Sequence, residues 1–213
     1  MPAPMTLVIG TKRYSSWSLR PWLAARMAGV DFDEVLITLR QPDTKAEILK
    51  HSPSGKVPCL LHGSLAIWDS LAICEYLAEL HPTLWPESRE ARAVARAVSA
   101  EMHSGFPHLR NACSMDMCAT TPLAEIPPEV AAEVARIQAL WSDCHARFGA
   151  RAGGPFLFGR FSIADAMFAP VVSRFTTFAI DLDAGARAYC DAVWSLPPMQ
   201  EWKQAACAGD LSP

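Results

Sequence analysis

The sequence predicts an α+β domain that is followed by an all-helical one. Up to residue 81, short apolar runs alternate with stretches of helical spacing, in the order β-α-β-α-β-β-α. A proline-containing run at residues 81–86 interrupts this order, and the apolar positions after it recur at the three- and four-residue spacing of helices. We therefore expect residues 1–81 to form one domain, 82–88 a linker and 89–213 an all-α bundle.

The first predicted strand is the apolar run Thr6 to Gly10. A polar turn leads from it into a helix over residues 17–28. Pro21 is expected in the first turn of this helix, where its missing N–H removes no hydrogen bond. Gly29 ends the helix, because glycine readily adopts the conformation found just after a helix C-terminus.

The remaining strands predict a mixed sheet. Residues 35–39 alternate as a strand, and the polar residues 40–56 form a loop around a short helix. Residues 57–61 and 64–68 are apolar runs joined by a turn at 62–63, which predicts a β-hairpin. Two strands linked through a helix pair in parallel and a hairpin adds antiparallel strands, which is the thioredoxin-like arrangement.

The second half of the chain predicts helices only. We expect the first of them to continue past a kink at Pro107. Ser162, with Asp165 three residues later, is close to a capping box, and we assign this pair to folding and not to chemistry. The longest predicted helical segments are 91–109, 130–148 and 163–178.

The composition is that of a soluble globular protein, with 51% hydrophobic and 19% charged residues among 213. A net charge of −3 and the absence of long Lys/Arg runs give no reason to expect nucleic acid. No apolar segment approaches the roughly 18 residues of a membrane helix, and the N-terminus does not resemble a signal peptide. We therefore expect a cytoplasmic protein that binds neither nucleic acid nor membrane.

The seven cysteines are an odd number and are scattered without a Cys-x-x-Cys pair. This usage predicts reduced, mostly buried thiols, as in cytoplasmic proteins. A zinc site among Cys113, Cys118, His103 and His108 would match no common ligand spacing, so we expect no metal.

The stretch from Val57 to Ile73 has the properties of a site for a small anionic peptide. Pro58 has no N–H and belongs at a strand edge, where an extended peptide can pair with the backbone. Asp69 and Ser70 are helix-capping residues, and a helix N-terminus offers free N–H groups and partial positive charge to a carboxylate.

This stretch resembles the glutathione-binding half of the glutathione transferases. The shared residues are Val57-Pro58 and, about ten residues later, the Asp-Ser-x-Ala-Ile motif at 69–73. The resemblance implies a cis Pro58, pairing of the Val57 backbone with the cysteinyl unit of glutathione, and binding of the γ-glutamyl end by Asp69 and Ser70. Lys56 can add positive charge for a glutathione carboxylate; a solvated loop lysine is the alternative.

The run Ser15-Ser16-Trp17-Ser18-Leu19-Arg20 resembles the Ser-Ser-Cys-Ser-x-Arg motif of the zeta class, which includes maleylacetoacetate isomerase. Trp17 stands where that motif has cysteine, which excludes reactive-cysteine chemistry at this position and weakens the isomerase assignment. The resemblance implies that Ser15, with Ser16 as the second candidate, donates a hydrogen bond to the glutathione thiolate. Helix capping is the alternative role for both serines.

One serine and one helix terminus are nearly enough for this chemistry. A thiol has a pKa of about 8.5, so ionisation at pH 7 needs a shift of about two pH units, or roughly 3 kcal/mol. A hydrogen bond to a charged partner contributes about 1.5–3 kcal/mol and a helix N-terminus about 0.3–1 kcal/mol.

The candidates for a substrate pocket rest on weaker signals. Glu101-Met102-His103 resembles the Glu-Leu-His of beta-class enzymes, whose histidine approaches the glutathione site from the helical domain. Core packing is the alternative for the apolar candidates; for the arginines it is a helix-surface charge or a surface salt bridge. The full set is Trp17, Arg20, Met102, His103, Phe106, Arg110 and Arg174.

The resemblance therefore implies a cytoplasmic, homodimeric glutathione transferase of a zeta-like or beta-like bacterial branch, acting in detoxification. It would use glutathione as co-substrate and attack a small hydrophobic electrophile. Two alternatives remain open: a glutathione-dependent cis–trans isomerase, and a non-catalytic binding protein that keeps the same fold.

Overall fold

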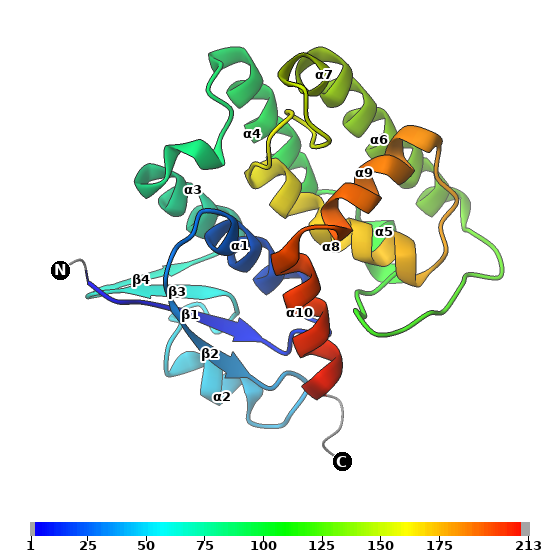
Figure 1. Ribbon diagram of the computed structural model, residues 1–213. Coiled ribbons are helices and arrows are strands. Elements are labelled where there is room, and N and C mark those ends of the chain that lie inside the picture. Colours follow the sequence, from blue (N-terminus) through cyan, green and yellow to red (C-terminus); the bar gives the residue numbers. More distant parts are fainter. Residues whose placement is uncertain (1–2, 210–213) are drawn as a thin grey trace.

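A computed structural model describes residues 3–209 of the chain. A four-stranded sheet has the strand order β2-β1-β3-β4 (Figure 1), with β1 Met5–Gly10, β2 Asp33–Ile37, β3 Cys59–His62 and β4 Leu65–Trp68. β1 pairs in parallel with β2 and antiparallel with β3, and β3 and β4 form the hairpin. The predicted thioredoxin-like part followed by a helical part is confirmed.

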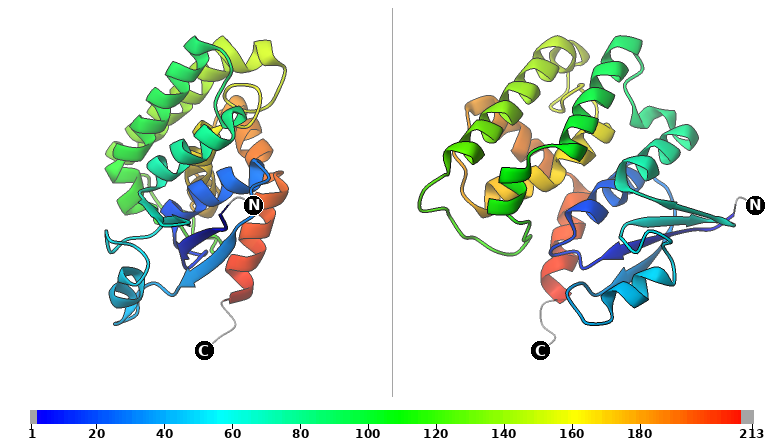
Figure 2. Two further views of the ribbon diagram at one scale, coloured as in Figure 1. Left: turned by 90° about the vertical axis from the view of Figure 1, so that its left-hand side faces the viewer. Right: turned by 180° about the vertical axis from the view of Figure 1, so that it is seen from behind.

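Helices cover both faces of this sheet. α1 (Ser16–Met27) and α3 (Ser70–Leu80) lie between the sheet and the helical part, and α2 (Thr44–Leu49) lies on the opposite face (Figures 1 and 2). β1 is buried on both faces. Leu7 and Ile9 pack in the core with α1 and α3, and Val8 packs with Ile48 of α2.

The first helix begins and ends close to its predicted positions. Gly29 follows it with a φ of +68°, the conformation that favours glycine after a helix. Pro21, however, lies inside the helix and not in its first turn, because α1 already begins at Ser16. Its missing N–H therefore removes a hydrogen bond that an ordinary residue would make to the carbonyl of Trp17.

The second part of the chain packs helices around α8 (Ile163–Thr177), which is buried along almost its whole length and contacts both α1 and α4 (Figure 2). This helix therefore joins the two parts of the molecule in one continuous core. The other elements are η1 Pro82–Leu84, α4 Arg89–Ser104, α5 Pro107–Ala112, α6 Pro128–Cys144, a π-helical turn η2 His145–Gly149, α7 Ala150–Ala152, α9 Ala184–Trp194 and α10 Pro197–Ala208.

The prediction that one helix continues past a kink at Pro107 is wrong. α4 ends at Ser104, and Phe106 has a left-handed φ of 61° before α5 begins. The residue before a proline is disfavoured in the helical region, which favours a break at Phe106. Glycine fits the turn before it, because a Cβ at position 105 would lie only 2.7 Å from the carbonyl oxygen of Glu101.

The capping box at the start of α8 is confirmed. The Asp165 carboxylate accepts hydrogen bonds from the Ser162 backbone at 2.8 Å and the Ser162 hydroxyl at 3.1 Å. It also accepts from the Leu157 N–H at 3.2 Å and the Tyr189 hydroxyl at 3.1 Å. Burial raises the pKa of Asp165 to about 6, although these donors oppose the shift.

The expectation that all cysteines are reduced is wrong for two of them. Cys118 and Cys207 form a disulfide across a sequence separation of 89 residues. The other five cysteines are free and buried: Cys59, Cys74, Cys113, Cys144 and Cys190.

No helix within residues 3–209 is long and apolar enough to cross a membrane. No three His, Cys, Asp or Glu side chains in that range are grouped so that they could hold a metal ion.

Candidate functional site

The entry to β3 has an unusual backbone. The peptide bond between Val57 and Pro58 is cis, as the resemblance implies. Pro58 is buried, Val57 is partly exposed, and the ladder pairing of β3 with β4 begins one residue later, at Cys59. Val57 therefore lies just outside the sheet, where its backbone can pair with an extended ligand.

The start of α3 lies at the end of the adjoining strand. Asp69 is its N-cap, with a φ of +76°, and its carboxylate accepts from the N–H groups of Leu71 at 2.9 Å and Ala72 at 3.3 Å. The Ser70 hydroxyl is buried and has no hydrogen-bond partner within residues 3–209. A buried hydroxyl without a partner points to a missing ligand or water.

A histidine from the helical part reaches this turn. His103 of α4 has its Nε2 at 3.1 Å from Oδ2 of Asp69. Burial lowers the pKa of His103, and the positive charges of Arg20 and Arg110 act in the same direction, whereas Asp69 opposes them. His103 is therefore neutral at pH 7, and its Nε2–H donates to Asp69.

Ser15 and Ser16 are both buried where the loop after β1 meets α1. Ser15 occupies the N-cap position, but its side chain makes no capping hydrogen bond. Its hydroxyl instead donates to Ser18 Oγ at 2.7 Å, and Ser18 Oγ also accepts from the Gly10 N–H at 3.1 Å. The alternative role predicted for Ser15, side-chain capping, is absent. Ser16 is the first residue of the helix.

Arg20 is fully buried, so it is not the surface charge that was the alternative. Within the described part of the chain, none of its three guanidinium nitrogens has a hydrogen-bond partner. Burial lowers the pKa of Arg20 to about 9; Arg110 and Arg174 lower it further, whereas Cys74 and Asp69 oppose them. The guanidinium lies 4.3 Å from the ring centroid of Trp17, and this cation–π contact compensates only part of the burial.

Arg110 and Arg174 donate hydrogen bonds to backbone carbonyls, and not to the carboxylates of surface salt bridges. Arg110 donates to backbone carbonyls at the end of α4, among them Gly105 at 2.8 Å. Arg174 is buried and donates to the carbonyl of Cys113. Burial, with Arg110 as a second cause, lowers the pKa of Arg174 to about 10.

Trp17 connects these groups. Its side chain is 37% exposed; the Arg110 guanidinium lies 4.9 Å from its ring and the His103 ring 5.2 Å from it, edge to face. The structure thus brings together four of the predicted pocket residues and places them beside Asp69. Met102 and Phe106, in contrast, are buried in the hydrophobic core, which is the alternative stated for them.

The family model described as "Glutathione S-transferase, N-terminal domain" matches residues 14–80. A probable maleylacetoacetate isomerase from Caenorhabditis elegans is 36% identical over 99 residues, which are 46% of this chain and 46% of that protein. The maleylacetoacetate isomerase of Rattus norvegicus is 34% identical over 102 residues, covering 46% and 47%. These matches span about half the length of the curated relatives.

Solved structures extend the similarity to the whole fold. A theta class glutathione S-transferase from Xanthomonas axonopodis pv. citri, with glutathione bound, is 26% identical, covers 94% of this chain and 97% of its own, and has a TM-score of 0.64. A glutathione transferase homologue from Burkholderia is 22% identical, covers 98% and 100%, and has a TM-score of 0.71. The chain therefore has the fold of the glutathione S-transferases, and its residues 14–80 match the N-terminal domain of that family.

The part matched by the glutathione S-transferase model contains both serines, the cis-proline turn and the start of α3. One residue of this region that the sequence analysis did not single out is Ser18, which accepts the hydrogen bond of Ser15. Its spacing was the available signal, because residues i and i+3 face each other at a helix start. Lys56 is exposed, and its backbone N–H donates to Ser54 Oγ at 3.2 Å.

A cavity of about 300 Å³ lies elsewhere in the molecule, between α6 and α9. Trp141, Leu157 and Tyr189 are among its lining residues, and none of the predicted site residues lines it. We therefore base the candidate site on the cis-proline turn, the two helix starts and the arginine cluster, and not on this cavity.

Proposed function

We propose that this chain is a glutathione transferase. Glutathione binds along Val57 and the start of α3 on the domain formed by residues 1–81, and the electrophile is held against the helices of residues 89–213. One observation carries the proposal: Ser70, at the N-terminus of α3 and beside the Val57–Pro58 turn, has a buried hydroxyl without a partner within residues 3–209.

Both charged groups of the γ-glutamyl unit have a complementary partner in the protein. Its carboxylate fits the Ser70 hydroxyl and the partial positive charge at the start of α3. Its ammonium group fits the Asp69 carboxylate, which His103 holds in place from α4. The cysteinyl backbone pairs with Val57, and the thiol is thereby directed towards the start of α1.

Ser15 is the proposed donor to the thiolate. In the ligand-free protein its single hydroxyl hydrogen is used on Ser18, so donation to sulfur requires rotation of the hydroxyl. Ser18 Oγ still accepts from the Gly10 N–H after that rotation. The Ser15 side chain is available because it does not cap α1.

An activity assay tests this function. With glutathione and an activated aryl chloride as electrophile, we expect saturable conjugation whose kcat/KM falls about 10- to 100-fold in Ser15→Ala, the loss of one charge-assisted hydrogen bond. Ser104→Ala, at an exposed helix position, is the control and should match the native protein. No conjugation above the uncatalysed rate with any of several electrophiles would contradict the proposal.

The arginine cluster favours a second candidate function, a glutathione-dependent cis–trans isomerase of acidic substrates. The positive charges of Arg110 and Arg174 act on Arg20 and lower its pKa. The nearby carboxylate of Asp69 is paired with His103. A carboxylate substrate would supply the missing negative charge. Maleate should then inhibit glutathione conjugation competitively and its dimethyl ester should not; equal inhibition by both would speak against this candidate.

We also propose that the protein is a cytoplasmic homodimer that acts in detoxification. Large apolar side chains are exposed on the edge strand β4, with Leu65 at 52% and Trp68 at 49% exposure. Contact with a second copy would bury them.

A further inference from the structure

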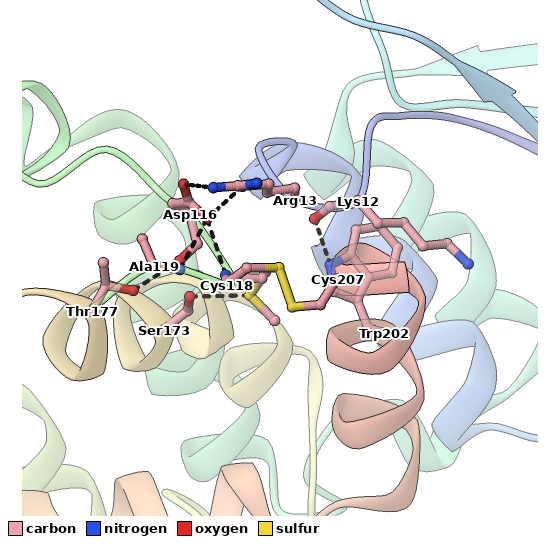
Figure 3. The surroundings of a disulfide bond; sticks show 10 residues. Lys12, Arg13, Asp116, Cys118, Ala119, Ser173, Thr177, Trp202 and Cys207 are labelled. Atoms are coloured by element: carbon pink, nitrogen blue, oxygen red, sulfur yellow. Dashed lines mark hydrogen bonds and ion pairs between the residues drawn. A yellow bond between two sulfur atoms is a disulfide. The ribbon is translucent and has the colours of Figure 1, made fainter. Parts of the chain in front are cut away.

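The Cys118–Cys207 disulfide joins the loop after α5 to the C-terminal helix α10, and both cysteines are partly exposed. Figure 3 shows that the residues around it converge on Lys12 and Arg13, two residues of the loop that leads to Ser15.

The loop that carries Cys118 holds Arg13. The Asp116 carboxylate accepts two hydrogen bonds from the Arg13 guanidinium, at 2.8 and 3.0 Å. The Met117 N–H donates to the Arg13 carbonyl at 3.1 Å. Asp116 is fixed in turn, because its carboxylate accepts from the Cys118 N–H at 3.0 Å and its carbonyl from the Thr177 hydroxyl at 2.9 Å.

The helix that carries Cys207 holds Lys12. The Trp202 indole N–H donates to the Lys12 carbonyl at 2.9 Å. The Trp202 ring is fully buried and packs at 5.0 Å, edge to face, against the ring of Trp22 in α1. Neighbouring residues of one loop are thus held by two elements that are far apart in sequence, and the disulfide links these two elements covalently.

We propose that Cys118 and Cys207 form a thiol–disulfide exchange site that controls the rigidity of the loop over residues 11–16. With the disulfide formed, α10 and the Cys118 loop hold this loop from both sides. With the disulfide reduced, the two elements separate more readily and the loop becomes more mobile. This inference goes beyond the proposed function and does not depend on it.

The exchange is balanced with a small thiol as reductant. The thiolate of one small thiol attacks one sulfur of the pair, the Sγ–Sγ bond breaks, and a mixed disulfide and one protein thiol form. A second small thiol resolves the mixed disulfide. Two small thiols are oxidised to one disulfide, and their two protons end on Cys118 and Cys207. The small disulfide reverses the reaction.

The other cysteines are poor competitors in this exchange. All five are buried, and burial raises the pKa of Cys144 and of Cys190 to about 12. A thiol must ionise to react, so these side chains are inert at neutral pH. The partly exposed pair is therefore the site at which small thiols and disulfides act.

Amide hydrogen exchange on the full chain, without glutathione, tests the proposal. Reduction with dithiothreitol should raise the exchange rates of residues 11–16 and 116–119 by at least about tenfold, while the amides of α8 stay protected. Glutathione and glutathione disulfide at varied ratios should then convert the two states reversibly, as read by alkylation and mass spectrometry. Unchanged exchange after reduction, or seven alkylated cysteines in the unfolded, unreduced protein, would overturn the proposal.

Variants separate the disulfide from other effects of the reductant. Cys118→Ser/Cys207→Ser should show fast exchange at residues 11–16 with or without dithiothreitol. Cys190→Ser removes a buried free thiol and should respond as the native protein does. Because the readout needs no bound glutathione, a failure of the transferase function would leave this result unaffected.

Discussion

Arg20 is the residue at which burial and charge oppose each other most strongly. Its guanidinium is fully buried, has no hydrogen-bond partner within residues 3–209 and lies near two other arginines. A buried charge without a partner destabilises the folded state unless a ligand supplies the opposite charge. Such a residue is therefore better suited to ligand binding than to the stability of the free protein.

Replacing Arg20 by methionine, which has a similar length and no charge, should raise the free energy of unfolding by about 1–3 kcal/mol. The native pKa of about 9 lies well below the ordinary value of arginine, so the unfolded chain binds this proton more tightly. The stability of the native protein should consequently rise as the pH increases above about 9, relative to that of Arg20→Met. Urea unfolding of both proteins across this range measures the difference. A less stable variant at neutral pH would show that the guanidinium has a partner in the folded protein.

At the scale of one element, α8 depends on the buried Asp165. This carboxylate accepts four hydrogen bonds, two from the first residue of its own capping box and two from Leu157 and Tyr189. It therefore links the start of α8 to α9 and to the loop that precedes α8.

Asp165→Asn should lower the free energy of unfolding by about 2–4 kcal/mol, because the amide NH2 then faces a buried donor. Burial raises the native pKa of Asp165 to about 6 from 3.8, so the folded protein binds this proton more tightly than the unfolded chain. The stability from this group is therefore present below about pH 4 and is lost as the pH rises through about 6. Asn has no such titration. Denaturation curves between pH 4 and 7 should show the slope in the native protein only, and identical slopes would contradict the account.

Local signals made the elements predictable. The strands follow from apolar runs, the hairpin from His62-Gly63, and the start of α8 from Ser162 and Asp165, because each signal lies within a few residues of the structure it specifies. The break after Ser104 was missed, because helical spacing continues across Phe106 while its backbone does not.

The composition of the site depends on distant residues and was only partly predictable. The cis-proline turn and the serines belong to short motifs, so the sequence analysis located them. The burial of Arg20 results from the packing of helices from both parts of the chain, and the Cys118–Cys207 pair is separated by 89 residues. Periodicity and spacing carry no information about such contacts.

At the scale of the whole molecule, one core extends through both parts, and the sheet keeps two edge strands, β2 and β4. The edge strand β4 exposes the large apolar side chains of Leu65 and Trp68, directly before Asp69 of the candidate site. We infer that this edge faces the second copy in the proposed dimer.

Trp68→Glu should therefore convert the dimer to a monomer, because a charge at the centre of an apolar contact is costly to bury. Leu36→Glu, a 57% exposed position on the other edge strand, is the matched control and should stay dimeric. Light scattering on purified proteins measures both. A native protein that is monomeric at all concentrations would exclude the dimer.

The most direct measurement of the central claim is the pKa of the glutathione thiol when bound to this protein, from ultraviolet titration of thiolate absorbance. We expect it to fall from about 8.5 to about 6.5–7 in the native protein and in Ser104→Ala, and to return most of the way in Ser15→Ala. A shift lost in Ser16→Ala instead would assign the donor to Ser16. A bound thiol that titrates like free glutathione, or no binding, would contradict the transferase account and leave a non-catalytic protein of the same fold.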